Sequence, residues 1–155
     1  MKKIVSGGQT GVDRAALDAA LDAGFPCGGW CPRGRLAEDG RIPDRYPLSE
    51  TPSTRYAERT EWNVRDSDGT LILTAGPLTG GTALTRTLAQ NHAKPLFVLD
   101  LRRDVDMAAV LDWIERHGIQ VLNIAGPRLR QQSEIYDLAY RFVRRLLAAT
   151  GAEQK

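Results

Sequence analysis

Two glycine-rich turns in the sequence have the composition of anion-binding turns. The first is SGGQTGVD (residues 6–13) and the second is TGGT (residues 79–82), and each stands between an apolar run and a helical pattern. Where a strand turns directly into a helix, the first main-chain N–H groups of the helix lack partners and the helix dipole favours a negative charge. The turns therefore predict two cradles for anions, the first made by the N–H groups of residues 9–12.

The first turn departs from two common nucleotide-binding motifs. A Walker A loop needs four residues between its glycines and then Lys with Ser or Thr, and no such lysine is present. The dinucleotide fingerprint GxGxxG fits better, with Ser6, Gly8 and Gly11 at the glycine places, but the acidic residue expected about 20 positions on is replaced by the basic segment CPRGR. These features argue against ordinary NAD binding and indicate an anion near Arg33 or Arg35.

Several polar and aromatic side chains have two interpretations. Asp13 either complements the dipole of the first helix or points into the site and binds a ligand hydroxyl, amine or metal. Trp30 either stacks on a flat ligand ring or belongs to the core. Arg59, Thr60 and Asn63 share one face of a polar helix, for which we expect exposure to solvent. The candidate binding residues are Gly7, Gly8, Gln9, Thr10, Gly11, Asp13, Trp30, Arg33, Arg35, Thr79, Gly80, Gly81 and Thr82.

The histidines and cysteines predict no further chemistry. No nucleophile–base pair or metal-ligand spacing surrounds His92 or His117, so neither catalytic residues nor metal ligands are predicted. On an extended strand, Cys27 and Cys31 would lie about 13 Å apart, which is beyond disulfide reach. We therefore interpret both cysteines as small buried core residues.

The elements that must position the candidate residues alternate between strand and helix. Apolar runs predict strands at KIVSG, FPCGGWCP, GTLILTAG, PLFVLDL and QVLNIAG. Helical patterns cover residues 12–23, about 53–65, 79–92, a stretch capped by Asp104 that ends at Gly118, and a last helix with Ile135, Leu138, Ala139, Phe142 and Leu146 on one face.

This alternation predicts an α/β fold with a central parallel sheet of about five or more strands and helices on both faces. In such folds ligands bind outside the carboxyl ends of the strands, near the switch in strand order. Both glycine turns, the arginine-rich loop after the second strand and the segment AGPR (residues 125–128) follow strands. We expect all four to converge on one edge of the sheet.

Length and composition favour one domain over residues 1–155, because 42% of the residues are hydrophobic, which suffices for a single core. A net charge of +2 from 21 basic and 19 acidic residues predicts no nucleic-acid partner. No apolar stretch approaches the roughly 20 residues that span a bilayer, and the start lacks a secretory signal. We expect a cytoplasmic protein that makes no membrane contact.

Four stretches of the chain resemble the molybdenum cofactor carrier family. They are SGGQTGVDRAALDAAL, GGWCPRGRLAEDGRIPDRYPL, DGTLILTAGPLTGGTALT and NIAGPR, and the likeness runs from residue 4 to the end of the last helix. The family is similar to a larger Rossmann-like group that includes the cytokinin-activating phosphoribohydrolases and the lysine decarboxylase-like proteins.

The resemblance implies a three-layer Rossmann-like fold and a carrier or storage protein for the molybdenum cofactor (molybdopterin). This ligand is an anionic pterin with a terminal phosphate and a dithiolene that chelates the metal. The two glycine turns and the arginine loop would hold it, and the protein would pass it unchanged to apo-molybdoenzymes or cofactor-biosynthesis proteins, with no catalytic cofactor of its own. Relatives in this group assemble, which implies a homo-oligomer, either a dimer or a tetramer.

The alternative is an enzyme or sensor that acts on a nucleotide-derived metabolite. The phosphoribohydrolase relatives carry the motif PGGxGTxxE, whose glutamate serves the cleavage of a nucleoside monophosphate. On this chain the last places of the motif fall on Gly81, Thr82 and Thr85, so that Thr85 replaces the glutamate. Threonine has no carboxylate to move a proton, which favours binding over catalysis. In the alternative, Asp13 or Glu38 supplies the carboxylate.

Overall fold

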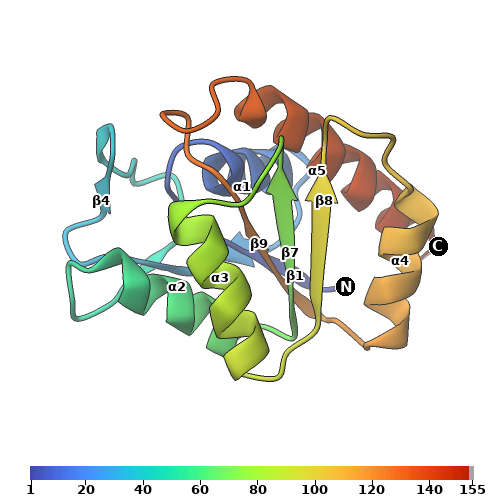
Figure 1. The fold of residues 1–155 in the computed structure, drawn as a ribbon, viewed down its shortest axis with the longest axis horizontal. Helices are drawn as coiled ribbons and strands as arrows, with labels where there is room; N and C mark the ends of the chain where they lie inside the picture. Colours follow the sequence, from blue (N-terminus) through green and yellow to red (C-terminus); the bar gives the residue numbers. More distant parts are fainter. Residues whose placement is uncertain (154–155) are drawn as a thin grey trace.

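The computed structural model describes residues 1–153 and has a central sheet of five parallel strands in the order β2-β1-β9-β7-β8 (Figure 1). The strands of this sheet are β1 (Lys3–Val5), β2 (Cys27–Gly28), β7 (Gly69–Thr74), β8 (Leu96–Asp100) and β9 (Val121–Ala125). The helices are α1 (Val12–Asp22), α2 (Tyr56–Arg65), α3 (Gly80–Asn91), α4 (Met107–Arg116) and α5 (Ile135–Glu153). The predicted α/β fold is confirmed.

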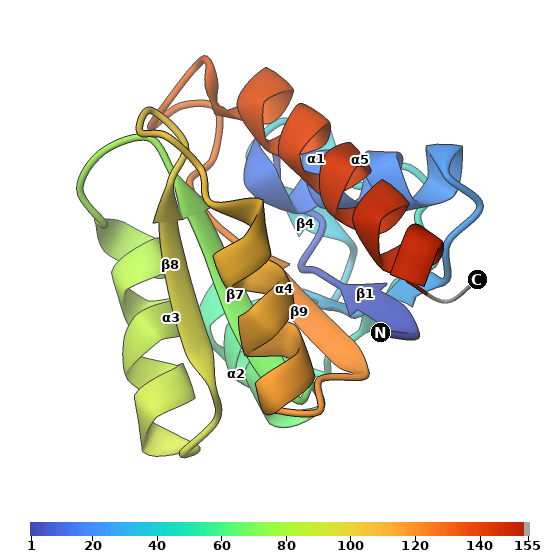
Figure 2. The same cartoon turned by 90° about the vertical axis from the view of Figure 1, so that its right-hand side faces the viewer.

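The helices cover both faces of the sheet and complete three layers. Helices α1, α4 and α5 pack on one face, and α2 and α3 pack on the other (Figure 2). This arrangement is the Rossmann-like architecture that the resemblance implies, with the β2 and β8 strands at the two edges of the sheet.

The two faces of the sheet differ in polarity. Successive side chains of a strand point to opposite faces, so Leu71 and Leu73 join the apolar cluster with α1, α4 and α5, whereas Thr70 and Thr74 point the other way. In β9, Asn123 alternates in the same way with the clustered Leu122 and Ile124, and its side-chain amide donates to the Thr70 hydroxyl at 3.3 Å. The face toward α2 and α3 is therefore partly polar although it is buried.

The predicted second strand is divided between two sheets. Residues 27–28 pair with β1, whereas β3 (Trp30–Cys31) pairs in parallel with β6 (Ser49–Glu50) away from the main sheet. Gly29 separates the two pieces with a φ of +129°, and a Cβ there would lie 2.3 Å from the carbonyl oxygen of Ser6. The chain can leave the sheet at this point only because this residue is glycine.

Two helix starts differ from the prediction. The cap of α4 is Asp106, whose carboxylate accepts from the Ala109 N–H at 3.1 Å, so the prediction of Asp104 as the cap is wrong by two residues. Helix α2 begins at residue 56 instead of about 53. Both differences are small, because helix boundaries depend on local capping contacts that periodicity does not fix.

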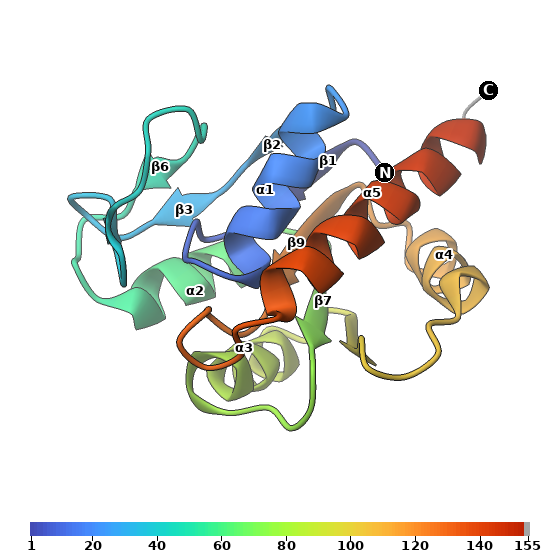
Figure 3. The ribbon, with the colours of Figure 1, turned by 90° about the horizontal axis from the view of Figure 1, so that it is seen from above.

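The long loop between β3 and α2 contains a small hairpin that stands over the opening turn. The hairpin pairs β4 (Leu36–Ala37) with β5 (Gly40–Arg41) in antiparallel fashion. Figure 3 views the molecule toward the carboxyl ends of the main strands, where the loops before α1, α3 and α5 lie close together. No helix within residues 1–153 is long and apolar enough to cross a membrane.

Candidate functional site

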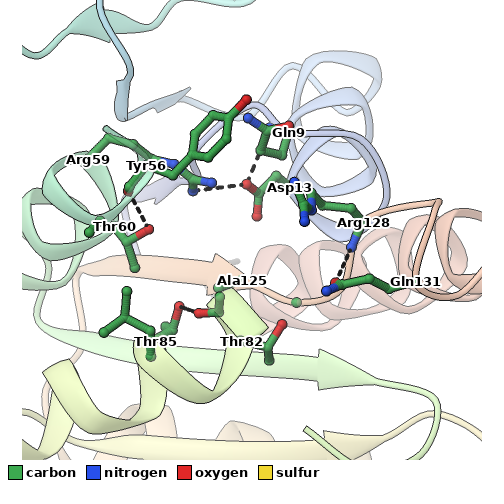
Figure 4. Close-up of a pocket in the computed structure, with 14 residues that line it drawn as sticks. Gln9, Asp13, Tyr56, Arg59, Thr60, Thr82, Thr85, Ala125, Arg128 and Gln131 are labelled. Carbon is green, nitrogen blue, oxygen red and sulfur yellow. Dashed lines mark hydrogen bonds and ion pairs between the residues drawn. The ribbon is translucent and has the colours of Figure 1, made fainter. Parts of the chain in front are cut away.

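A cavity of about 240 Å³ opens at the carboxyl ends of β9 and β7 (Figure 4). It draws its walls from four parts of the chain that are far apart in sequence. The lining residues are Gln9 and Asp13 from the first turn and α1, Tyr56, Ala57, Arg59 and Thr60 from α2, Gly81, Thr82, Leu84 and Thr85 from α3, and Ala125, Gly126, Arg128 and Gln131 after β9. The expected convergence of both glycine turns and AGPR is therefore confirmed.

An ion pair between Asp13 and Arg59 lies in the wall of this cavity. The Nη1 atom of Arg59 is 3.3 Å from Oδ2 of Asp13, and the two side chains are 14% and 5% exposed. The same carboxylate oxygen accepts from the main-chain N–H of Gln9 at 3.3 Å. Asp13 thus lies both in the first turn of α1, where an acidic side chain complements the helix dipole, and in the cavity wall; its binding of a ligand stays a prediction.

The pair is held in an environment that disfavours charge. Burial raises the pKa of the Asp13 carboxyl above its ordinary value of 3.8, and the Arg59 guanidinium and the Gln9 N–H offset only part of this effect. The Nε of Arg59 is buried and has no hydrogen-bond partner among the described residues. A carboxyl group with a raised pKa in a cavity is a group that can bind or exchange a proton.

Gly7 provides the space for the Arg59 side chain. A Cβ on Gly7 would lie 2.0 Å from Nη1 of Arg59 and 2.9 Å from Oδ2 of Asp13. Any side chain at this position would displace one member of the ion pair. The glycine of the first turn is therefore needed for the arginine of α2, and not only for the bend of the chain.

The first turn is packed against the chain that follows β9. The Val12 N–H donates to the carbonyl oxygen of Pro127 at 3.2 Å, and a Cβ on Gly11 would lie 2.3 Å from that oxygen. Since the Gln9 N–H is bound to Asp13, two of the four N–H groups predicted to form the first cradle are engaged within the protein. The other two groups are those of Thr10 and Gly11, and both residues are buried and lie outside the cavity lining.

The second glycine turn opens directly onto the cavity. Helix α3 follows Thr79, whose side chain makes no capping hydrogen bond, and its first turn contributes Gly81 and Thr82 to the lining. The hydroxyl of Thr85 donates to the carbonyl oxygen of Gly81 at 2.9 Å and also faces the cavity. This helix start has the geometry that favours a negative group of a ligand.

Comparison with known proteins identifies the fold family. A model of the circularly permuted YpsA SLOG family matches residues 4–147. The chain belongs to this family. A crystal structure described as "Putative molybdenum carrier protein", from Syntrophus aciditrophicus SB, is 51% identical in sequence and superposes with a TM-score of 0.90 over 95% of each chain. No curated protein matches the chain significantly. The resemblance to the molybdenum cofactor carrier family is confirmed.

The permutation of the YpsA SLOG family is visible in the strand order. Numbered from β7 through β8 and β9 and then on to β1 and β2, the sheet reads 2-1-3-4-5, which is a common doubly wound order. The switch in strand order then falls between β7 and β9, where α3 and α5 leave on opposite faces of the sheet. The cavity lies at this switch point, as expected for a ligand site in this architecture.

Thr85, which stands where the phosphoribohydrolase motif has its glutamate, lines the cavity. The cavity that lacks a glutamate at Thr85 contains the carboxyl group of Asp13, which comes from the other glycine turn. A carboxyl is thus present at the site of this family member, although it does not stand where the phosphoribohydrolase motif would put it.

Four of the thirteen candidate residues line the cavity, namely Gln9, Asp13, Gly81 and Thr82, and the nine that do not include Trp30, Arg33 and Arg35. Arg35 is buried, and its guanidinium donates to four carbonyl oxygens, those of Ile42, Pro43, Tyr46 and Leu48. Arg33 is exposed in the turn after β3. Trp30 makes an edge-to-face contact with Trp62 and donates to Asp66 at 2.9 Å. Arg35 therefore organises its own loop, and these positions give no direct support to ligand contact.

The other candidates are divided between the cavity and its surroundings. The side chain of Gln9 is used by the hairpin, since its Nε2 donates to the Leu36 carbonyl and its Oε1 accepts from the Glu38 N–H at 3.1 Å. Thr10 donates its hydroxyl to Glu38. Gly8 packs against Ile42 and Leu48, and Gly80 precedes Gly81 at the helix start. Both cysteines are free thiols, as predicted.

Helix α2 contributes more to the cavity than its sequence predicts. The expectation that Arg59, Thr60 and Asn63 are exposed is wrong, because Thr60 and Asn63 are 8% and 3% exposed and Arg59 pairs with Asp13. Tyr56 and Gln131 also line the cavity, and no motif in the sequence predicts them. The shared face of Arg59, Thr60 and Asn63 was the available signal, but helical spacing does not say whether the face meets solvent or another part of the chain.

Among residues 1–153, no group of three or more His, Cys, Asp or Glu side chains could hold a metal ion. Arg59 and Arg128 are the cationic side chains of the cavity lining, and Asp13 is its acidic one. The site therefore has the polar groups to bind an organic anion through hydrogen bonds and ion pairs.

Proposed function

We propose that this protein binds and carries the molybdenum cofactor or a closely similar phosphate-bearing pterin, and that the cavity at the β7/β9 switch point is its binding site. The observation that carries the proposal is that this one cavity combines an open helix start with Arg59, Arg128 and a buried carboxyl group. The similar protein from Syntrophus aciditrophicus SB is described as a molybdenum carrier, which supports the choice of ligand.

The chemistry of the lining suits the two ends of such a ligand. The start of α3 and the guanidinium of Arg128 would receive the phosphate, because a helix N-terminus and arginine both favour oxyanions. Tyr56, which is 39% exposed, would offer its ring face to the flat pterin. A cavity of about 240 Å³ is smaller than a typical ligand pocket, so part of the ligand would remain in the open mouth.

Native mass spectrometry of protein purified without oxygen tests this proposal. The protein should carry the intact cofactor near one equivalent per binding site when made in cells that synthesise it, and should be empty when made in cells that cannot. Intact ligand released on denaturation supports a carrier. A protein that is empty from both sources, or that carries a cleaved product, contradicts it.

The second candidate is an enzyme or sensor that acts on a nucleotide-derived metabolite. It is favoured by one observation, namely that Asp13, with its raised pKa, faces the same cavity as Thr85. Incubation with a panel of nucleoside monophosphates, with Asp13→Ala as the control, tests it by the release of free base. Turnover that is lost in Asp13→Ala supports the enzyme, whereas no turnover across the panel supports a pure binding protein.

We further propose that the carrier works in the cytoplasm as a homo-oligomer, a dimer or a tetramer, and delivers its ligand to apo-molybdoenzymes or cofactor-biosynthesis proteins. The edge strand β8 carries the exposed side chain of Val98, and α3 beside it carries the exposed Leu84, which is consistent with a contact between copies. Light scattering coupled to size-exclusion chromatography tests this point, and a mass of one chain at micromolar concentration would contradict it.

A further inference from the structure

Glu38 lies in the β4–β5 hairpin, and its carboxylate packs against the first glycine turn. The hairpin itself is largely exposed, and Leu36, Asp39 and Gly40 face solvent. The side chain of Glu38 is nevertheless only 5% exposed. A buried carboxylate on an exposed hairpin requires partners that stabilise its charge.

The groups around the Glu38 carboxylate are hydrogen-bond donors and guanidinium groups of the kind that bind oxyanions, and only part of them form hydrogen bonds with it. Its Oε1 accepts hydrogen bonds from the Thr10 hydroxyl and from the main-chain N–H of Arg130, the latter at 3.3 Å. Its Oε2 is buried and has no hydrogen bond from any described residue. The Nε atoms of Arg128 and Arg130 lie 3.7 and 3.9 Å from Oε2, near enough for attraction but too far for a hydrogen bond.

The charge of these partners exceeds that of the carboxylate. Two guanidinium groups face one carboxylate, together with a hydroxyl and a main-chain N–H at the start of a loop. A tetrahedral oxyanion with two negative charges and more acceptor oxygens would use the same donors more fully. The site is thus better matched to a phosphate group than to the carboxylate that fills it.

This oxyanion site is continuous with the cavity. Arg128 lines the cavity and also approaches Glu38, and Thr10 directly follows Gln9, which lines the cavity. The Thr10 hydroxyl additionally accepts from the Leu129 N–H at 3.2 Å, which holds the two loops together. A ligand group that entered this site would therefore remain joined to a ring system in the cavity.

We propose that Glu38 occupies the binding place of an oxyanion of the ligand, and that the hairpin of residues 36–41 is a lid that a phosphate group displaces. The proposal rests on the proposed function only in that the ligand carries a phosphate. The lid is held mainly by polar contacts, which include two hydrogen bonds to the Gln9 side chain, one from the Arg130 guanidinium to the Glu38 carbonyl oxygen, and the Arg14–Asp39 ion pair at 2.5 Å. Such a segment opens at lower cost than one anchored by apolar burial.

Titration calorimetry with inorganic phosphate tests the displacement. Glu38→Gln keeps the shape of the side chain and removes its charge, so phosphate should bind about tenfold more tightly than to the unaltered protein. The matched control is Glu115→Gln, which removes an exposed carboxylate of α4 outside the hairpin and the cavity lining, and should change the affinity less than twofold, within about 0.4 kcal/mol. Equal affinity in the unaltered protein and Glu38→Gln, or equal gains in both variants, would overturn the proposal.

Hydrogen exchange of the unaltered protein gives a test that does not depend on a variant folding. Saturating phosphate should speed the exchange of the amides of residues 36–41 and slow that of residues 128–131, because the anion replaces the lid on the loop. Binding that protects the hairpin, or leaves it unchanged, would contradict a lid that is displaced.

AMP as a second probe distinguishes a phosphate group on an organic ligand from a free oxyanion. It also tests the displacement of Glu38 independently of the carrier function. AMP binding more tightly than inorganic phosphate would show that the group arrives on an organic ligand, and equal binding would show a site for free oxyanions; either result supports the site if it responds to Glu38→Gln. The test needs no molybdenum cofactor. A protein that never carries the cofactor could still show the displacement, and a true carrier could fail it.

Discussion

The carboxylate of Asp13 and the guanidinium of Arg59 meet at 3.3 Å in the wall of the cavity, although the two residues are 46 positions apart. Each is supplied by a different layer of the fold, Asp13 by α1 on one face of the sheet and Arg59 by α2 on the other. The pair therefore joins the two helical layers across the carboxyl ends of the strands. Its loss should affect both stability and binding.

Arg59→Ala should lower the free energy of unfolding by about 3 kcal/mol at neutral pH, because it leaves a buried carboxylate without its partner. The loss should shrink as the pH falls, because burial raises the pKa of Asp13 and a protonated carboxyl no longer needs a counter-charge. Urea denaturation at neutral pH and at a series of lower pH values measures both quantities. Arg55→Ala, at an exposed position just before the same helix, is the control and should cost less than about 0.5 kcal/mol.

Gly7→Ala should act through Arg59. The new methyl group would lie 2.0 Å from Nη1 of Arg59, so the guanidinium must leave Asp13 and the protein should lose about 1–3 kcal/mol of stability. Gly151→Ala in α5, where a Cβ meets no atom within 4 Å, is the control and should be neutral or slightly stabilising.

A double-mutant cycle shows whether this account of Gly7 is right. In a protein that already carries Arg59→Ala, the methyl group meets no guanidinium, and Gly7→Ala should cost at least about 1 kcal/mol less than it does alone. Additive effects of the two substitutions would mean that the first turn rejects a side chain for some other reason.

The strands and helices could be predicted from the sequence because their signals are local. The apolar run of residues 69–74 and the helical spacing from Met107 to Ile114 are read within one element, and both are confirmed. The strand order is not local. That residues 121–125 insert between β1 and β7 depends on how the whole chain packs, and the permuted order follows from that insertion.

The candidate site could be predicted in part for the same reason. The glycine turns can be recognised from their composition. Their convergence follows from the rule that the carboxyl ends of parallel strands lie at the same edge of the sheet. Arg59 and Arg35 illustrate the limit, because the sequence predicts exposure for Arg59 and ligand contact for Arg35, yet Arg59 pairs with Asp13 and Arg35 binds four carbonyl groups of its own loop. Only the tertiary contacts distinguish a guanidinium that lines the cavity from one that organises a loop.

Arg128 and Arg33 should differ in their effects on ligand binding. Arg128 lines the cavity and faces the oxyanion site, whereas Arg33 lies outside the lining. Arg128→Gln should weaken the binding of AMP or the cofactor by about tenfold to a hundredfold, since a hydrogen bond to a charged group contributes about 1.5–3 kcal/mol. Arg33→Gln should leave the affinity within about twofold. Titration calorimetry at fixed salt measures both affinities. A larger loss of affinity for Arg33→Gln than for Arg128→Gln would mean that the arginine-rich loop contacts the ligand.

The stability of the protein should depend on pH through Asp13 with a definite sign. Because burial raises the pKa of Asp13 in the folded state, the folded protein holds a proton over a pH range where the unfolded chain has released it. The contribution of Asp13 is therefore complete below its ordinary pKa of 3.8 and is lost as the pH rises through the folded-state pKa. Asp13→Asn has no such titration. Its free energy of unfolding should therefore increase relative to that of the unaltered protein as the pH rises above about 4, by up to about 1.4 kcal/mol per pH unit.

Asp39 provides a control of opposite sign for this pH dependence. The hydrogen bond from Arg14 lowers the pKa of Asp39, so its contribution to stability is present above 3.8 and is lost as the pH falls through the folded-state pKa. Asp39→Asn should therefore differ from the unaltered protein by a constant amount above about pH 5, whereas Asp13→Asn gains from about pH 4 up to the folded-state pKa of Asp13. Urea denaturation of the three proteins across pH 4–8 measures the differences. A constant difference for Asp13→Asn over that range would mean that Asp13 is ionised at every pH tested, and that the buried pair with Arg59 holds its charge.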